Sequence, residues 1–251
     1  MDSQHEKHDR ETEVLIRKNV KKFGWHVSLF NAEGYQPPFA YTIGLYESFG
    51  HPELIGFGLP PQLLGTILNS IGQQIQAEGL RVVTDKYYYD IIDRYPVQFV
   101  EVHPSHYPEY LGYCGWYYQF QFDFPILQLV WPDRDSNFPW DEAYEPAYRS
   151  RQLLLDNPAL YQFRASKHLD VITTRQVMEG APILHVMHTE SGEWQFHSEA
   201  EPAQADVAIV KLGQLVHMDP TLNQLSAMPK QHYAFRSAAN SPWEVFDESQ
   251  H

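Results

Sequence analysis

The 251-residue sequence has little cysteine and no long hydrophobic run. Cys114 is its one cysteine, which excludes an internal disulfide and a zinc site with four cysteine ligands. No stretch approaches the roughly 18 consecutive apolar residues of a membrane-spanning helix. The polar N-terminal stretch also lacks the apolar centre of a secretory signal. These absences predict a cytoplasmic protein that has no membrane partner.

Basic side chains are scarce as well. The sequence has 18 Lys and Arg against 32 Asp and Glu, so its formal net charge is −14. Residues 25–159 hold 6 basic and 16 acidic side chains, and residues 160–251 hold 6 and 11. A surface of this sign repels phosphate backbones, which disfavours nucleic-acid binding. The charge then either attracts a basic protein partner or serves solubility alone.

The common catalytic motifs are missing. The sequence has no G-x-S-x-G nucleophile elbow, no phosphate-binding P-loop and no G-x-G-x-x-G dinucleotide motif. It therefore indicates no particular reaction and leaves any cofactor unknown.

What is present favours a folded protein of one large or two small domains. Hydrophobic residues make up 43% of the sequence and aromatic residues 14%, which is enough to build a core. Residues 1–12 are expected to form a tail and residues 13–23 a short amphipathic helix. Residues 60–79 have apolar side chains at helical spacing between Pro60 and Gly79, which predicts a longer amphipathic helix. Alternation and apolar runs predict strands at residues 25–30, 39–45, 53–57, 97–102 and 125–131, and residues 105–119 read as an aromatic-rich helical segment.

The second part of the chain predicts a smaller domain. Residues 141–168 are charged and contain two prolines, which indicates a helical linker with a boundary near residues 160–168. Strands are expected at residues 171–178, 183–189, 194–197 and 207–211, and short helices at 212–217 and 222–228. The sequence thus predicts an α+β fold: an N-terminal mixed sheet packed by an amphipathic helix, then a smaller α+β domain. The expected divisions are residues 1–19, 20–160 and 168–251.

Several stretches of the first part resemble a bacterial family known as domain of unknown function 4262. The resemblance covers roughly residues 20–155 and brings no established activity, so it implies a shared fold and signature positions. The stretches that carry it are Gly24–Val27, Pro37–Leu45, Gly50–Pro60, His106–Gly112 and Leu127–Trp140.

The second part loosely resembles immunity-protein-like domains found beside bacterial toxin systems. The similar stretches are Val177–Gly180, Pro182–His188, Gly192–Phe196 and Leu212–Pro229, which includes Asp219 and Pro220. This resemblance implies a toxin-like basic protein as the partner.

One group of residues offers acid–base chemistry, and a second offers metal ligands. Tyr41 and Thr42 on one expected strand can come near His51 and Glu53, and a histidine beside a carboxylate is the minimum for a general base. The structural interpretation of these residues is a strand followed by a turn. His106 and Tyr107 form the second group. With His103 they offer two metal ligands, which is fewer than a metal site usually needs.

A third group follows the last strand of the first domain. Asp133 and Asp135 begin like a calcium-binding loop, but the glycine and the final glutamate of an EF-hand are missing. The structural interpretation of Asp133 is that it caps a turn. Trp131 and Trp140 either stack on a ligand or cover the core.

The remaining candidates favour structural roles. Cys114 lies in an aromatic stretch and is expected to be a small buried residue. His185, His188 and His197 can cluster across neighbouring strands, but the first two point to opposite faces of one strand, so no metal site is predicted.

Two hypotheses remain. The first is a non-enzymatic binding or toxin-immunity-type protein, which rests on the acidic charge, the missing catalytic motifs and the second resemblance. The alternative is an enzyme or small-ligand-binding protein whose pocket brings together Tyr41, His51, His106 and Asp133. Thr42, Glu53, Tyr107, Trp131, Asp135 and Trp140 are its expected binding residues.

Overall fold

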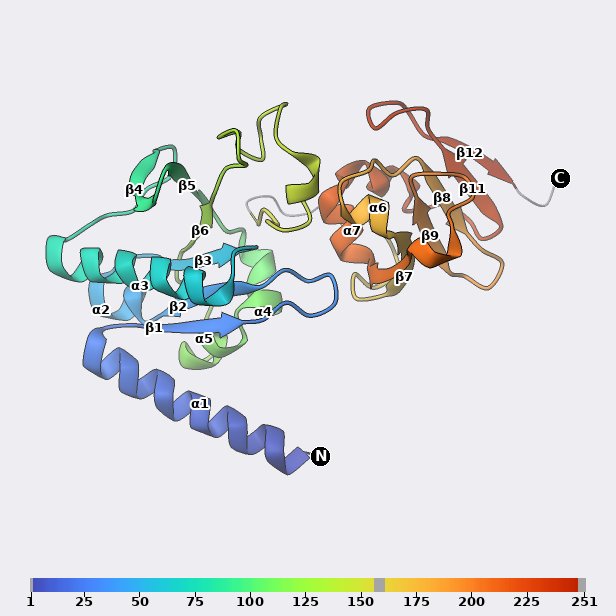
Figure 1. Ribbon diagram of the computed structural model, residues 1–251. Coiled ribbons are helices and arrows are strands. Elements are labelled where there is room, and N and C mark those ends of the chain that lie inside the picture. Colours follow the sequence, from blue (N-terminus) through green and yellow to red (C-terminus); the bar gives the residue numbers. More distant parts are fainter. Residues whose placement is uncertain (1, 156–160, 248–251) are drawn as a thin grey trace. The chain divides into compact units, whose positions relative to one another are not determined.

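Two compact units make up the chain. The computed structural model describes residues 2–155 and 161–247. One unit consists of Met1–Glu142 with Leu154–Pro158, and the other of Ala143–Leu153 with Ala159–His251. Each is built on a six-stranded mixed sheet with helices, as Figure 1 shows, so the predicted α+β class is confirmed.

The sheet of the first unit has the strand order β1-β2-β3-β6-β5-β4. Neighbours are antiparallel except for β3 and β6, which are parallel. Five of the six strands lie where the sequence predicts them, and β4 is the addition. The strands are β1 (His26–Phe30), β2 (Phe39–Ile43), β3 (Glu53–Phe57), β4 (Tyr88–Ile92), β5 (Tyr95–Glu101) and β6 (Ile126–Val130).

The predicted amphipathic helix is confirmed as α3 (Pro61–Glu78). Pro61 presets its first turn, and Gly79 ends it in a left-handed conformation with φ +67°. Its buried face packs on the sheet, where Leu64 contacts the backbone of Gly56 and Gly72 lies against the indole of Trp25. Strands β2, β3 and β6 are buried along their whole length, so both faces of the sheet are covered.

The opposite face is covered by short helices between β5 and β6. Adjacent residues of a strand point to opposite faces, so Tyr41 faces away from α3, and its hydroxyl accepts a hydrogen bond from the backbone N–H of Tyr113 (3.2 Å). Tyr113 lies in the predicted aromatic-rich helical segment. The short elements of this unit are α2 (Leu45–Phe49), the 3-10 helix η1 (Pro104–His106), α4 (Tyr107–Tyr110) and α5 (Gly112–Tyr117).

The N-terminal segment differs from its prediction. A single helix, α1 (Asp2–Phe23), takes the place of the expected tail and short helix. Ile16 and Val20 bury its C-terminal half in the first unit. Nearer the start of α1, Asp9 accepts a hydrogen bond from the hydroxyl of Tyr113 (2.8 Å). Arg17 of the same helix lies over the ring of Trp116. These polar and aromatic contacts to α5 come from residues 90 or more positions away, which local periodicity cannot reveal.

The expected helical linker over residues 141–168 is also different. Its described part has one 3-10 turn, η2 (Pro146–Tyr148), and its residues 156–160 lie outside the described residues. Residues 143–153 pack inside the second unit: the hydroxyl of Ser150 donates to the carbonyl of Met178 (2.8 Å), and Gly180 lies against the backbone of Ala147. Proline lacks the backbone N–H that a helix interior requires, which disfavours a helix here. Tertiary contacts within the second unit set the conformation of residues 143–153 instead.

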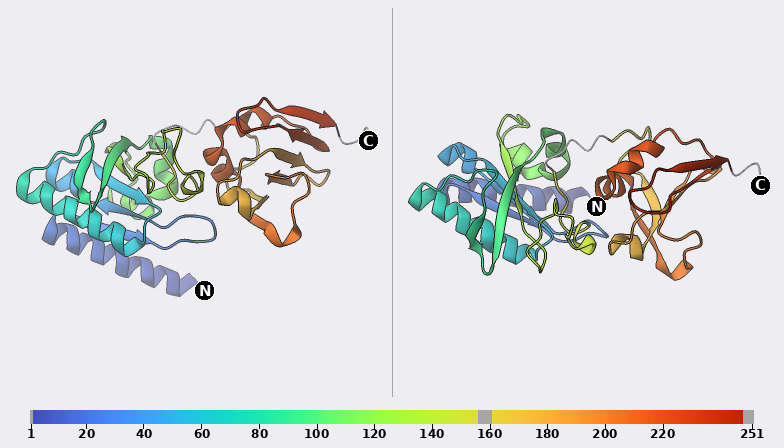
Figure 2. Two further views of the ribbon diagram at one scale, coloured as in Figure 1. Left: turned by 45° about the horizontal axis from the view of Figure 1, so that its top comes forward. Right: turned by 90° about the horizontal axis from the view of Figure 1, so that it is seen from above.

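The second unit has the strand order β10-β7-β9-β8-β11-β12, in which β7 and β9 are parallel. Figure 1 and Figure 2 show this unit in yellow to red. The expected strand at residues 171–178 is β7 followed by a helical turn, and the expected helix at 222–228 is a 3-10 helix. Strands β11 and β12 had no counterpart in the prediction. The elements are β7 (Asp170–Thr174), α6 (Arg175–Met178), β8 (His185–His188), β9 (Trp194–His197), η3 (Gln204–Asp206), β10 (Val207–Lys211), α7 (Leu212–Met218), η4 (Pro220–Leu225), β11 (His232–Phe235) and β12 (Glu244–Asp247).

Candidate functional site

A buried carboxylate, Glu53, lies at the start of β3. Its two oxygens accept four hydrogen bonds: from the hydroxyls of Thr42 (2.6 Å) and Tyr118 (2.6 Å), and from the backbone N–H groups of Gly44 (2.7 Å) and Tyr46 (3.1 Å). The hydroxyl of Thr42 in turn accepts from the N–H of Leu54 (2.8 Å). The sequence predicted that Thr42 and Glu53 meet, and Tyr118 is the partner that it missed.

The environment of Glu53 opposes charge. Burial raises the pKa of its carboxyl, and the four hydrogen bonds only partly offset this effect. Burial, together with the nearby Glu53 charge, also raises the pKa values of Tyr118 and Cys114. Cys114 is fully buried, as expected of a small packing residue and not of a reactive thiolate. The carboxylate therefore holds the turn after β2 against α5 and β3.

His51 is fully buried two residues before Glu53. Because the carbonyl of Pro52 can only accept, the ring Nδ1 donates to it (2.7 Å), and Nε2 accepts from the backbone N–H of Val82 (3.1 Å). Burial lowers the pKa of this ring, which keeps it neutral. With both nitrogens committed to the backbone, His51 joins two loops and has no nitrogen left for a substrate.

Three further candidates lie among aromatic rings in the same unit. Burial raises the pKa of Tyr41, whose hydroxyl contacts α5. His106 is buried in η1. Four residues earlier, the backbone N–H of Val102 donates to the carbonyl of Ile126 at the start of β6 (3.0 Å). Tyr107 stacks on Phe124 at 5.8 Å, and burial raises its pKa to about 12.

Asp133 folds its own loop. Its Oδ1 accepts from the backbone N–H groups of Asp135 and Asn137 (both 2.9 Å), and its Oδ2 accepts from the amide of Asn137 (3.2 Å). This is the turn-capping role that the sequence allowed. Trp131 is buried and donates to the carbonyl of Phe57 (2.8 Å), so it covers the core.

The catalytic candidates do not converge on one pocket. Glu53 lies opposite Ile126 at the start of β6, and Asp133 follows the other end of that strand. From Ile126 to Val130 the strand is about 13 Å long at ~3.3 Å per residue. Thr42, Glu53 and Tyr107 therefore lie toward one edge of the sheet, and Trp131, Asp133 and Asp135 lie beyond the other.

Trp140 borders a separate groove of the first unit. The groove has a volume of about 370 Å³ and is lined by Trp140, by Asp85 and by β5 as far as Glu101. The ring of Trp140 is 46% exposed and stacks on Phe138 at 5.1 Å. An exposed indole between two carboxylates suits a cationic side chain.

The sheet of the second unit has an open face. Strand register places six side chains in one row across it, and none of them is buried. On β7 to β11, neighbours of these residues belong to the core on the other face, among them Val171, Val186, Trp194, Phe196, Val210 and Ala234, whereas Val245 of β12 is exposed. The row consists of Ile209, Ile172, Gln195, Met187, Tyr233 and Phe246. Ile209 is 64% exposed and Phe246 46%, so this face carries accessible apolar surface.

The Asp219-Pro220 motif has a structural role. Asp219 begins η4, where its Oδ1 accepts from the N–H of Thr221 (3.1 Å), and its Oδ2 pairs with the buried guanidinium of Arg236. Arg236 also donates to the carbonyl of Ile183 (2.8 Å). The pair thus ties η4 to the ends of β8 and β11.

Within residues 2–155 and 161–247, no three His, Cys, Asp or Glu side chains gather closely enough to hold a metal ion. The helices of the same residues include none that is both long and apolar enough to cross a bilayer.

A family model described as domain of unknown function DUF4262 matches residues 19–145. The match spans half of the chain and includes the sheet of the first unit, the Glu53 cluster and the Asp133 loop. The chain belongs to this family. No curated protein and no solved structure matches it.

Proposed function

We propose that the chain is a non-enzymatic binding protein of the toxin-immunity type, located in the bacterial cytoplasm, whose partner is a basic protein. The observation that carries this proposal is the open sheet face of the second unit. Its row has exposed Ile209 and Phe246 on the two edge strands and half-buried Ile172, Gln195, Met187 and Tyr233 between them. Apolar side chains left accessible on a surface are typical of protein interaction sites.

Acidic residues in the strands and loops of this sheet favour a basic partner. Glu244 lies two residues before Phe246 on β12 and so points to the same face, and the loop that leads from β9 into β10 carries Glu199, Glu201 and Asp206. Apolar area at the centre with charge at the rim is the usual anatomy of a protein interface. Acidic side chains at the rim accelerate association with a positively charged surface.

The enzyme hypothesis lacks such an observation. Both ring nitrogens of His51 are hydrogen-bonded to the backbone, and the carboxylate of Asp133 accepts hydrogen bonds from its own loop. Because these residues lie in different places and are saturated by local partners, the geometry favours binding over catalysis by the four candidates.

The test uses the protein encoded beside the gene of this chain. That protein is expressed in a host with and without the chain, and growth is measured together with co-purification of the two proteins. The proposal predicts that the neighbour arrests growth, that the chain relieves the arrest, and that the two proteins co-purify.

Matched variants locate the surface. Ile209→Asp together with Phe246→Asp is expected to weaken the complex at least tenfold, because each introduces a charge into an apolar contact. Leu63→Asp, at a residue 43% exposed on α3 of the first unit, is the control and is expected to bind normally. A neighbour that is harmless, or a complex equally tight with the double variant and the control, contradicts the proposal.

A further inference from the structure

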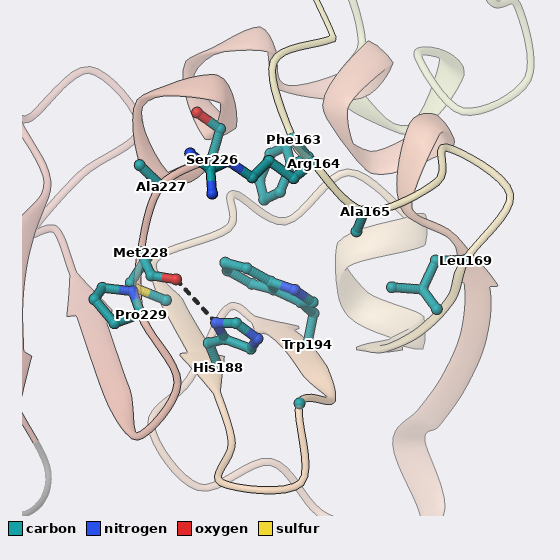
Figure 3. A pocket seen from close by; sticks show the side chains of 11 residues that line it. Phe163, Arg164, Ala165, Leu169, His188, Trp194, Ser226, Ala227, Met228 and Pro229 are labelled. Carbon is teal, nitrogen blue, oxygen red and sulfur yellow. Dashed lines mark hydrogen bonds between the residues drawn. The ribbon is translucent and has the colours of Figure 1, made fainter.

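A cavity of about 410 Å³ opens on the second unit, on the side of the sheet opposite its open face. Figure 3 shows its lining, which comes from the chain before β7, from β8 and β9, and from the segment after η4. Its volume lies in the range of small-molecule sites. The open face and the proposed protein partner do not involve this cavity, so its occupant is a separate question.

Aromatic and apolar side chains form the walls. The rings of His188 and Trp194 stack at 4.0 Å with 13° between their planes, and Phe163 meets Trp194 edge-on at 5.2 Å. His188 is fixed because its Nδ1 donates to the carbonyl of Met228 (2.9 Å). Leu169 and Met228 complete the apolar lining. Flat walls of this kind suit a planar ring.

The polar groups of the cavity are donors. Arg164 lines it and forms no ion pair or hydrogen bond with any residue that the structure describes. Within the same described part of the chain, the indole N–H of Trp194 has no acceptor. Ser226 also lines the cavity (Figure 3). Among the described residues that line the cavity there is no Asp or Glu, although the whole sequence has a net charge of −14.

We propose that this cavity binds a small planar aromatic carboxylate. The ring of the ligand contacts Phe163, Trp194 and Met228, and its carboxylate pairs with Arg164. A guanidinium that has no partner among the described residues prefers a carboxylate because the two planar groups match in geometry as well as in charge. A neutral ring would leave Arg164 without an acceptor, and a cation would be repelled by it.

The test is a titration of the full chain followed by the indole N–H signals in nuclear magnetic resonance. The probes are 2-naphthoate, its neutral amide 2-naphthamide, and acetate, which has the charge without the ring. The Trp194 signal is identified through its correlation to the β9 backbone. We expect 2-naphthoate to move this signal saturably and to bind about tenfold more tightly than 2-naphthamide, and acetate to cause no saturable change.

Two arginine variants separate the cavity from general charge effects. Arg164→Gln is expected to bind naphthoate and naphthamide equally, and Arg175→Gln, at an exposed arginine in α6 outside the cavity, to keep the preference. Both positions are exposed, so neither change disturbs the core. The proposal is overturned if saturating naphthoate leaves the Trp194 signal in place, or if Arg164→Gln retains the preference for the anion.

Discussion

At the scale of single residues, Glu53 is the most constrained side chain of the family domain. Its carboxylate is buried, accepts four hydrogen bonds and has a raised pKa. Removing it leaves donors on β2, α2 and α5 without an acceptor. We expect Glu53→Ala to lower the free energy of unfolding by about 3 kcal/mol, and Glu53→Gln by about 1 kcal/mol, because the amide keeps one acceptor oxygen. Denaturant titration measures both.

The raised pKa of Glu53 gives a pH dependence of known sign. Above the ordinary glutamate value of 4.5 the unfolded chain releases this proton while the folded chain retains it. The contribution of Glu53 to the free energy of unfolding therefore falls as pH rises. The stability gap between the parent and Glu53→Gln should shrink between about pH 4 and about pH 7. A gap that widens over this interval would show that the folded state favours the charged form.

His51 is expected to act in the opposite direction. Burial lowers its pKa, so below its ordinary value of 6.5 the unfolded chain binds a proton that the folded chain excludes. The contribution of His51 to the free energy of unfolding is therefore lost as pH falls through this range. At about pH 7, His51→Asn should cost about 1–2 kcal/mol through its broken backbone bonds, and less at about pH 5. His168→Asn, at an exposed residue, is the control in the same denaturation series.

At the scale of elements, α1 is tied to the first unit by one face. Ile16 is fully buried, whereas its neighbour Leu15 is 48% exposed. We expect Ile16→Ala to cost about 2–4 kcal/mol, because it removes a buried side chain, and Leu15→Ala to change stability by less than about 0.5 kcal/mol. Thermal unfolding of the two variants checks this, and equal losses would mean that the helix is docked by another face.

Local signals in the sequence account for which elements could be predicted. α3 was predictable because its apolar spacing, Pro61 and Gly79 all agree. The hairpin of β4 and β5 was hidden, because Arg94 takes φ +69° where a two-residue turn usually has glycine. β11 (HYAF) and β12 (EVFD) have apolar residues next to one another and so lack the alternation of β9 (WQFH), which is equally short.

The candidate residues divide in the same way. Thr42 and Glu53 could be paired from sequence because a hairpin brings neighbouring strands together. The hydroxyl of Tyr118 donates to Glu53 from 65 positions away. Arg164 and Trp194 line one cavity only because of tertiary folding. Such long-range partners leave no periodic or motif signal in a single sequence.

The roles predicted for Tyr41, His106 and Trp140 in binding or catalysis stay predictions.

At the scale of the whole molecule, the division into two units predicts how the chain can be cut. Residues 143–153 belong to the second unit, where Ser150 bonds to Met178 and Gly180 packs on Ala147. The two units alternate here, because Leu154–Pro158 belong to the first unit, and we propose that residues 143–153 are needed for the second unit to fold. A fragment of residues 143–251 should unfold cooperatively and at a higher temperature than residues 161–251, as measured by circular dichroism. Equal melting temperatures would mean that the second unit folds without residues 143–153.

The proposed function rests on the open face of the second unit, and hydrogen–deuterium exchange tests this proposal most directly. The chain is compared with and without its neighbour-encoded partner, following the backbone amides of β10 and β12, the two edge strands of that sheet. We predict slower exchange in both strands when the partner binds, and no slowing in Ile209→Asp with Phe246→Asp. Slowing confined to the first unit, or none in either unit, would contradict the account.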